Sequence, residues 1–139
     1  MKLVVTDEED LKVMSAGLQD AVGKVGDFAY DAAARRFAAV VNRFRWEDGN
    51  KPNMRVRTGF HFDDVLGVKA ARIRQDDPEG IVSLLSVDFT AGEDAAGAVT
   101  LNFSGGGAIR LDVECLNAHI EDISAPWRAR RRPHHETDG

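Results

Sequence analysis

Apolar and polar side chains alternate through residues 24 to 115 in short runs, which Gly or Pro interrupts about every ten residues. The run 54–62 is the clearest case, because its apolar residues fall on even positions and Arg55, Arg57 and His61 fall on odd ones. Successive side chains of a strand point to opposite faces, so such runs predict strands with one buried face. The pattern predicts seven antiparallel strands, over residues 24–30, 36–46, 54–62, 65–75, 81–89, 98–104 and 108–115.

The glycine run in the stretch FSGGGAIRL, residues 103–111, separates the last two of these strands. A phosphate-binding loop would lead from a strand into a helix, whereas here a second alternating run follows. We therefore expect a hairpin, in which glycine supplies the left-handed conformation that a three-residue loop needs. A loop of residues 105–107 would place apolar residues opposite one another, in the pairs Phe103 and Ile109, Leu101 and Leu111, and Val99 and Val113.

The same register collects polar side chains on the outer face of the hairpin, where Asn102 would face Arg110. One interpretation is a solvated sheet face with a single cross-strand ion pair, which contributes little to stability. The other is a binding surface for a peptide or a small anion. Asn102 and Arg110 would contribute to that surface, and Arg55 and Arg57 would supply further hydrogen-bond donors.

A helix is expected before the strands. Thr6 and Glu9 have the spacing of a capping box, apolar residues then recur at helical spacing, and Gly23 is a suitable end. A second, short helix is expected after Cys115, with a bulged strand as the alternative over residues 116–124. The apolar residues that favour this helix are Leu116, Ile120 and Ile123.

Together these elements predict an α+β fold. An N-terminal helix would pack on a mainly antiparallel, seven-stranded sheet that forms a sandwich or a partly open barrel, with a short C-terminal helix. Seven strands and a closing helix would resemble a pleckstrin-homology-like barrel. A chain of 139 residues suits one domain, which we expect over residues 1–127, followed by a basic, flexible tail over residues 128–139.

No residue pattern indicates catalysis or a cofactor. His61 lies near Asp63 and Asp64, but neither His61 nor His119 has the spacing of a metal site, and no metal is expected. Cys115 continues the apolar series of its strand and is expected to be buried and unreactive.

The net charge of −5 indicates which classes of partner are expected. An acidic body repels nucleic acid and anionic membranes, so neither is expected as a partner, although the arginines after Trp127 are a local exception. No run approaches the roughly 20 apolar residues of a membrane-spanning helix, and the first residues lack the pattern of a signal peptide. A single cysteine fits a reducing compartment, and a cytoplasmic protein is therefore expected.

Three stretches, LQDAVGKVGDFAY, RRFAAVVNRFRWE and VTLNFSGGGAIRLDVECL, resemble a family of small, single-domain bacterial proteins of unknown function. The resemblance covers most of residues 3–133 and implies no activity, cofactor or site residue. From the residues themselves we expect a non-catalytic interaction or accessory module that binds a protein partner or forms a homodimer. The alternative is a small-molecule-binding protein or an enzyme with a pocket inside the curled sheet.

Overall fold

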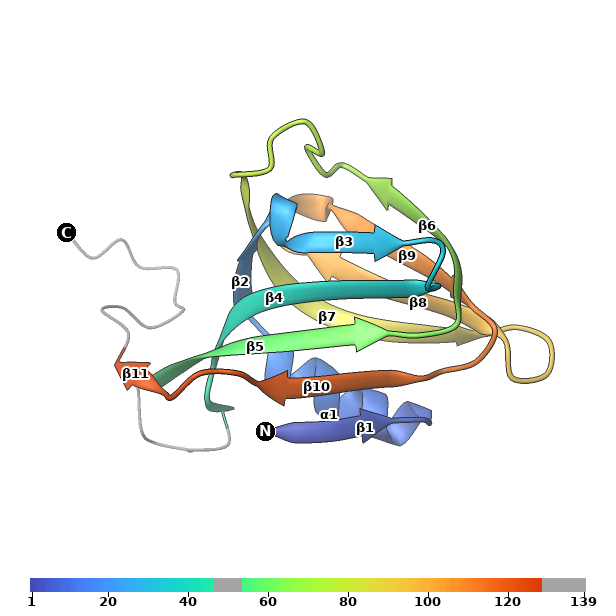
Figure 1. Ribbon diagram of the computed structural model, residues 1–139, viewed down its shortest axis with the longest axis horizontal. Helices are drawn as coiled ribbons and strands as arrows, with labels where there is room; N and C mark the ends of the chain where they lie inside the picture. Colours follow the sequence, from blue (N-terminus) through green and yellow to red (C-terminus); the bar gives the residue numbers. More distant parts are fainter. Residues whose placement is uncertain (47–53, 129–139) are drawn as a thin grey trace.

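The computed structural model describes residues 1–46 and 54–128, which contain one α-helix and eleven strands (Figure 1). The helix is α1 (Glu8–Leu18), and η1 (Val25–Asp27) and η3 (Ser104–Gly106) are short 3-10 turns. The strands are β1 (Lys2–Val5), β2 (Ala21–Lys24), β3 (Phe28–Asp31), β4 (Arg36–Phe44), β5 (Met54–Phe62), β6 (Val65–Ala71), β7 (Ile81–Ala91), β8 (Gly97–Phe103), β9 (Ala108–Val113), β10 (Ala118–Asp122) and β11 (Trp127–Arg128). The predicted basic tail lies outside the described residues from position 129 onward. No helix in the described part of the chain is long and apolar enough to cross a membrane.

The strands form a single antiparallel sheet that curls strongly (Figure 1). Its interior is filled by one cluster of buried apolar residues. The order is β1-β10-β5-β4-β2-β7-β8-β9-β6, with β3 paired to β4 and β11 paired to β5. One edge of β4 pairs with β5, whereas its other edge is shared between β3 and β2. The sheet does not close, because β3 and β6 are neighbours without strand pairing. We call the gap between these two strands the seam.

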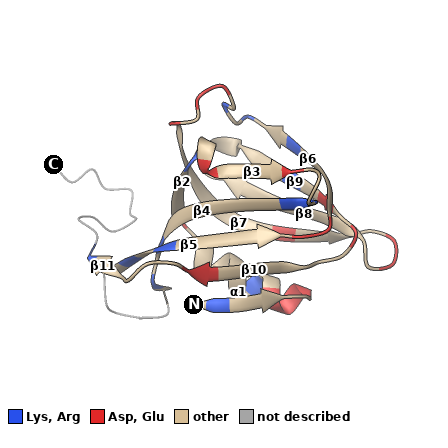
Figure 2. Ribbon diagram, viewed as in Figure 1, with Lys and Arg blue, Asp and Glu red and all other residues tan. Residues whose placement is uncertain are grey.

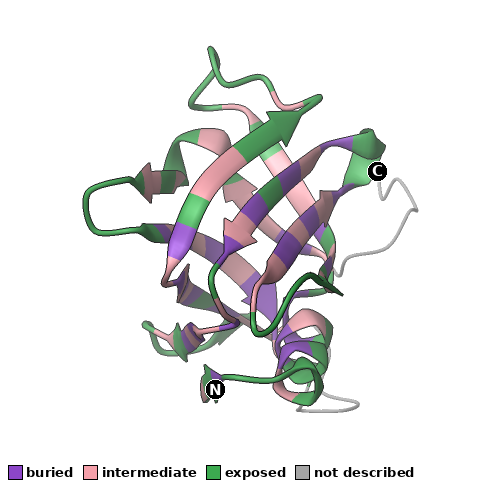
Figure 3. Cartoon of the chain, turned by 90° about the vertical axis from the view of Figure 1, so that its right-hand side faces the viewer, coloured by how far each residue is buried: buried purple, intermediate pink, exposed green. Residues whose placement is uncertain are grey.

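Buried and exposed residues alternate along the strands, as the sequence pattern predicts (Figure 3). β5 has the predicted bounds, and Val56, Phe60 and Phe62 on its inner face are each no more than 2% exposed. Helix α1 packs against β7 and β1 and buries Leu11 and Met14. An α+β fold with an N-terminal helix on a mainly antiparallel, open sheet is therefore confirmed.

The predicted number of strands is wrong, because the described residues form eleven strands rather than seven. The expected strand 24–30 is interrupted by η1. Before η1 the chain is paired with β7 as β2, and after η1 it is paired with the first half of β4 as β3. The edge strands β1 and β11 were not predicted, because two to four residues are too few to show an alternating pattern.

The predicted C-terminal helix is also wrong, because β10 occupies this segment. Ala118 and Ile120 are buried at alternate positions, and β10 is paired with β5 on one side and β1 on the other. Apolar residues at 116, 120 and 123 imitate helical spacing, but Leu116 lies in the loop before the strand and Ile123 lies after it. The described residues therefore lack the closing helix of a pleckstrin-homology-like barrel.

Strands β8 and β9 form the predicted hairpin, but their pairing is shifted by two residues from the predicted one, in which residues 105–107 form the loop. Asn102 pairs with Ala108, and Arg110 faces a threonine rather than Asn102. The loop is longer because η3 extends it, with Gly105 and Gly106 at φ values of 85° and 90°. A shift of two residues leaves each side chain on its predicted face, so the apolar residues still point into the core.

Helix α1 begins one residue later than predicted. Asp7 is the N-cap, and its side chain accepts a hydrogen bond of 2.8 Å from the Asp10 amide, while Asp10 accepts one of 3.3 Å from the Thr6 amide. Carboxylates at this end also interact favourably with the positive end of the helix dipole. Figure 2 shows the acidic first turn in red. The helix ends at Leu18, so Gly23 lies in a strand rather than at the helix end.

A buried ionic cluster joins β4, β5 and β10. Arg43 is 0% exposed and donates from Nε and Nη2 to the two carboxylate oxygens of Asp122, at 2.9 and 2.8 Å. Thr58 donates to the same carboxylate at 2.8 Å. The amino group of Met1 also donates to it. Arg43 Nη1 also donates to the Phe44 carbonyl at 3.0 Å. We call this arrangement the Arg43–Asp122 cluster.

The cluster keeps Asp122 ionised. Burial on its own would raise the pKa of this carboxyl, but hydrogen bonds from Arg43, the Met1 amino group and Thr58 outweigh burial and lower the pKa to about 2. The negative charge that Arg43 requires is therefore present throughout the neutral and mildly acidic range.

Replacing Asp122 by Ala should lower the free energy of unfolding by roughly 3–5 kcal/mol, because the buried Arg43 would lose the carboxylate to which it donates two hydrogen bonds. Arg36→Ala is the matched control, since the ion pair of Arg36 with Asp63 is half-exposed and such pairs contribute roughly 0–1 kcal/mol. Chemical denaturation followed by circular dichroism measures both variants. Equal losses in the two variants would contradict the structural role of the cluster.

The low pKa of Asp122 also predicts a pH dependence. A carboxyl whose pKa is lowered by folding stabilises the protein above its unfolded pKa, and this contribution is lost as the pH falls through the folded value. The free energy of unfolding should therefore decrease between about pH 4 and pH 2. It should decrease less in Asp122→Asn, which keeps the side-chain shape. Parallel pH profiles of the variant and the original protein, measured by denaturation, would contradict the assignment.

Candidate functional sites: a cavity at the seam and a histidine pair

An apolar cavity of about 140 Å³ lies at the seam. Its walls come from η1 and β3 on one side and from β6 and the following loop on the other. Aromatic side chains form much of the lining, with apolar residues of β6 and the loop opposite them. The lining includes Phe28, Tyr30, Phe37, Phe103, Val68 and Ile73.

The seam is closed at one end and open at the other. The Tyr30 hydroxyl donates to the Val65 carbonyl at 2.8 Å, and the Val65 amide donates to the Arg35 carbonyl at 2.9 Å. These bonds tie the end of β3 to the start of β6. At the other end, exposed Ala70 and Gln75 border the cavity, so its mouth faces solvent there.

Phe28 anchors the aromatic lining of the cavity. Its ring centroid lies 5.7 Å from that of Phe103, 6.4 Å from that of Phe37 and 6.5 Å from that of Phe60. Edge-to-face and tilted contacts at these separations are favourable. Strands β3, β4, β5 and β8 are thus held together around the cavity by one aromatic cluster, which gives the cavity a defined shape.

The structure places the predicted binding residues in two separate regions. Asn102 lies on β8 and donates to Ser86 at 3.1 Å and to Asp88 at 2.8 Å, and Arg110 on β9 contacts Asp112 at 3.1 Å. Arg55 and Arg57 lie on β5, which β4, β2 and β7 separate from β8 in the sheet.

The two arginines of β5 also have different surroundings. The Arg55 guanidinium lies 3.9 Å from the centre of the Phe44 ring, and burial lowers its pKa. Arg57 is exposed. The structure therefore does not bring the four predicted residues into one surface, and a binding role for either pair stays a prediction.

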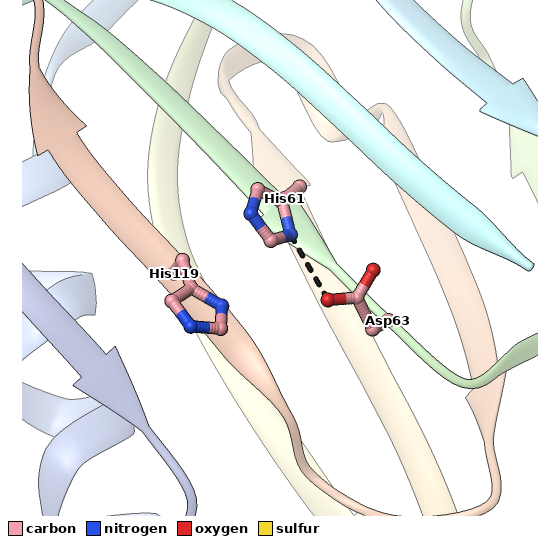
Figure 4. Close-up of side chains that lie close together, drawn as sticks. All are labelled: His61, Asp63 and His119. Atoms are coloured by element: carbon pink, nitrogen blue, oxygen red, sulfur yellow. Dashed lines mark ion pairs between the residues drawn. The ribbon is translucent and has the colours of Figure 1, made fainter.

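A pair of histidines faces outward from neighbouring strands. His61 on β5 is directly paired with His119 on β10, and their rings stack with centroids 4.8 Å apart (Figure 4). The carboxylate of Asp63 lies beside them, with Oδ2 at 3.3 Å from His61 Nδ1. Arg36 Nε donates to Asp63 Oδ1 at 2.7 Å. Sequence spacing missed this group, because 57 residues of chain separate two histidines that strand pairing places side by side.

Charges and burial set the ionisation of this group. Burial, followed by the charge of Arg36, lowers the pKa of His61. Burial acts in the opposite sense on Asp63, but the hydrogen bond from Arg36 and the charge of His61 lower the pKa of that carboxyl below its ordinary value. At neutral pH the site therefore presents a neutral His61 imidazole beside an ionised Asp63 carboxylate.

Asp64 belongs to a different contact, although it is next to Asp63 in the chain. It accepts from Cys115 Sγ at 3.4 Å and from the Asn117 amide group at 3.2 Å. Burial and this hydrogen bond raise the pKa of the Cys115 thiol, which favours the unreactive, protonated form. Cys115 is partly buried rather than fully buried as expected, because β9 ends at Val113.

These features define a small α+β domain, built from one curled antiparallel sheet with an apolar cavity at its unpaired seam. The model of the family described as "Protein of unknown function (DUF2948)" matches residues 1–135, and the chain belongs to this family. The family resemblance seen in the sequence is therefore confirmed. No curated protein and no solved structure is significantly similar to the chain.

Proposed function

We propose that this protein binds a small, mainly apolar molecule with one polar group in the cavity at the seam, inside a sheet that forms a partly open barrel. The cavity itself is the observation that carries the proposal. Protein interiors are packed closely enough that voids larger than a water molecule are few. An apolar cavity of about 140 Å³ with a mouth toward solvent is therefore suited to a ligand.

The volume and lining of the cavity favour a ligand group about the size of one aromatic ring. An engineered apolar cavity of roughly 150 Å³ binds benzene, whereas sites for drug-sized molecules occupy roughly 300–1,000 Å³. The rings of Phe28 and Phe103 offer edge and face contacts to such a group.

Polar groups at the cavity would orient the ligand. The Tyr30 hydroxyl uses its proton on the Val65 carbonyl, so toward a ligand its oxygen could act only as an acceptor. Gln75 at the mouth carries both a donor and an acceptor. A single-ring molecule with one hydroxyl or amino group, such as phenol, matches this arrangement.

Filling the cavity should abolish binding of phenol. Ala70 lines the cavity, and Ala70→Phe would place a ring in the space proposed for the ligand. Ala71→Phe is the matched control, because it adds the same ring at the next residue of β6, which points to the opposite face of the sheet. Titration of each protein with phenol, followed by 1H–15N NMR, should show saturable shifts of seam residues in the original protein and in Ala71→Phe, but not in Ala70→Phe.

The proposal fails if phenol and benzene both cause no saturable shifts in the original protein at millimolar concentration. It also fails if Ala70→Phe, shown by its spectrum to be folded, binds phenol as well as Ala71→Phe does. Either result would mean that the cavity is a packing feature of the fold.

A groove beside β1 supports a second candidate function, the formation of a homodimer. Leu3, Val13 and Trp46 line a groove of about 560 Å³ between β1 and α1, and Val13 and Trp46 are 53% and 43% exposed. Among the described strands β1 pairs only with β10, so its other edge is open to pairing. Antiparallel pairing of two β1 strands about a two-fold axis would cover both grooves, in the symmetric arrangement that most homodimers use.

Val13→Lys should weaken such a dimer, because it places a charge in the apolar groove. Leu66→Lys is the matched control, since Leu66 on β6 is 52% exposed and lies away from the groove. Sedimentation velocity over a range of protein concentrations should show a dimer for the original protein and the control, and a monomer for Val13→Lys. A monomer for all three proteins at high concentration would contradict the dimer.

A further inference from the structure

We propose that His61, Asp63 and His119 form a binding site for a divalent transition-metal ion, with Zn²⁺ as the best match. The site lies on the outer face of the sheet, away from the cavity at the seam. Two strands contribute to it: β5 and the residue after its end supply His61 and Asp63, and β10 supplies His119. Figure 4 shows the three side chains gathered on this face.

The ligand atoms are already close to the spacing that a metal requires. Zn²⁺ binds nitrogen and carboxylate oxygen at roughly 2.0–2.2 Å, so two ligands at a tetrahedral angle lie about 3.4 Å apart. His61 Nδ1 and Asp63 Oδ2 are 3.3 Å apart. One ligand atom from each of the three residues lies within 4.8 Å of the other two, and the stacked ring of His119 has to turn about its side-chain torsions to complete the site.

Unpaired nitrogen atoms provide a second, independent indication. The Nδ1 atoms of both histidines are buried; that of His119 has no hydrogen-bond partner, and that of His61 has only the 3.3 Å contact with Asp63 Oδ2, which does not meet the geometry of a regular hydrogen bond. Leaving a buried polar atom without a partner costs free energy. On the neighbouring strands, Val4 of β1 is paired with His119 and Ala38 of β4 is paired with His61. The side chains of Val4 and Ala38 cannot hydrogen-bond to the imidazoles. A metal ion would give both nitrogens a partner.

Arg36 positions the carboxylate for this role. Its Nε hydrogen bond of 2.7 Å engages Asp63 Oδ1, whereas the Nη2 contact to Oδ2 is longer, at 3.4 Å. Oδ2 is thus the oxygen turned toward His61. Groups that hold a ligand in this way are a regular part of metal sites. Arg36 is a positioning residue and does not itself bind the metal.

The ligand set selects the class of metal. Two imidazoles and one carboxylate suit Zn²⁺ and neighbouring transition metals, whereas Mg²⁺ and Ca²⁺ prefer oxygen ligands only. Three protein ligands on an exposed face leave a fourth position for water. The ion would also connect β10 to β5.

Isothermal titration with ZnCl2 tests the site, in tag-free protein that carries His134→Ala and His135→Ala. These changes remove the other two histidines of the chain, which are a separate source of metal binding. We expect one Zn²⁺ per chain and a Kd that rises at least about 10-fold in His61→Ala, His119→Ala and Asp63→Asn. Glu114→Gln is the matched control for Asp63→Asn, because Glu114 also pairs with an arginine, Arg35, but lies outside the site. Its Kd should be unchanged.

A second measurement separates metal binding from loss of folding. In the background protein, which carries only His134→Ala and His135→Ala, saturating Zn²⁺ should shift the imidazole NMR signals of His61 and His119 and raise the Tm. Zn²⁺ should leave the Tm unchanged in a folded variant of that protein that also carries His61→Ala and His119→Ala. Absence of stoichiometric Zn²⁺ binding in the background protein would overturn the proposal. Unchanged binding in the folded double variant would overturn it as well.

Discussion

The fold depends on the ion pair between Arg43 and Asp122, because this pair determines how the far ends of three strands meet. Arg43 is an inward-facing residue of β4, at a position that apolar residues occupy elsewhere on the strand. A buried guanidinium needs a charged partner and further hydrogen bonds, and Asp122, the last residue of β10, supplies the charge. Since Asp122 can meet Arg43 only when β10 pairs with β5 in the observed register, the pair also specifies the alignment of the C-terminal strand.

The cavity arises from a different constraint, the sharing of one edge of β4 by two strands. β2 pairs with both β4 and β7 and so makes the sheet continuous at one end. After η1 the chain follows β4 as β3, and none of the described strands bridges from β3 to β6. The sheet therefore opens along the seam, and aromatic residues line the resulting space. The proposed ligand site is thus a direct consequence of the point at which the sheet fails to close.

The histidine pair shows how strand pairing creates chemistry that spacing does not reveal. His61 and His119 lie far apart in the chain and meet because β5 and β10 are neighbours in one register. A shift of one residue would turn His119 to the other face of its strand, and a shift of two would move it away from His61. The cluster with Asp63 therefore depends on the same alignment that the Arg43–Asp122 pair favours at the other end of these strands.

Local patterns were sufficient for the class of the fold, for the bounds of β5 and for the faces of β8 and β9, because alternation and turn residues act between near neighbours in the chain. They were not sufficient for β1 and β10, for the length of the glycine loop or for the histidine pair. Leu116, Ile120 and Ile123 fit a helix or a strand equally well by themselves, and pairing with β5 decided the outcome. Side-chain polarity and a period of two are enough to assign the buried face of β5, β8 and β9 from the sequence, whereas a register shift between Leu84 and Ser86 in β7 leaves Ile81 and Leu85 exposed. Which strands are neighbours, and where the sheet stays open, depends on long-range pairing that no local pattern encodes.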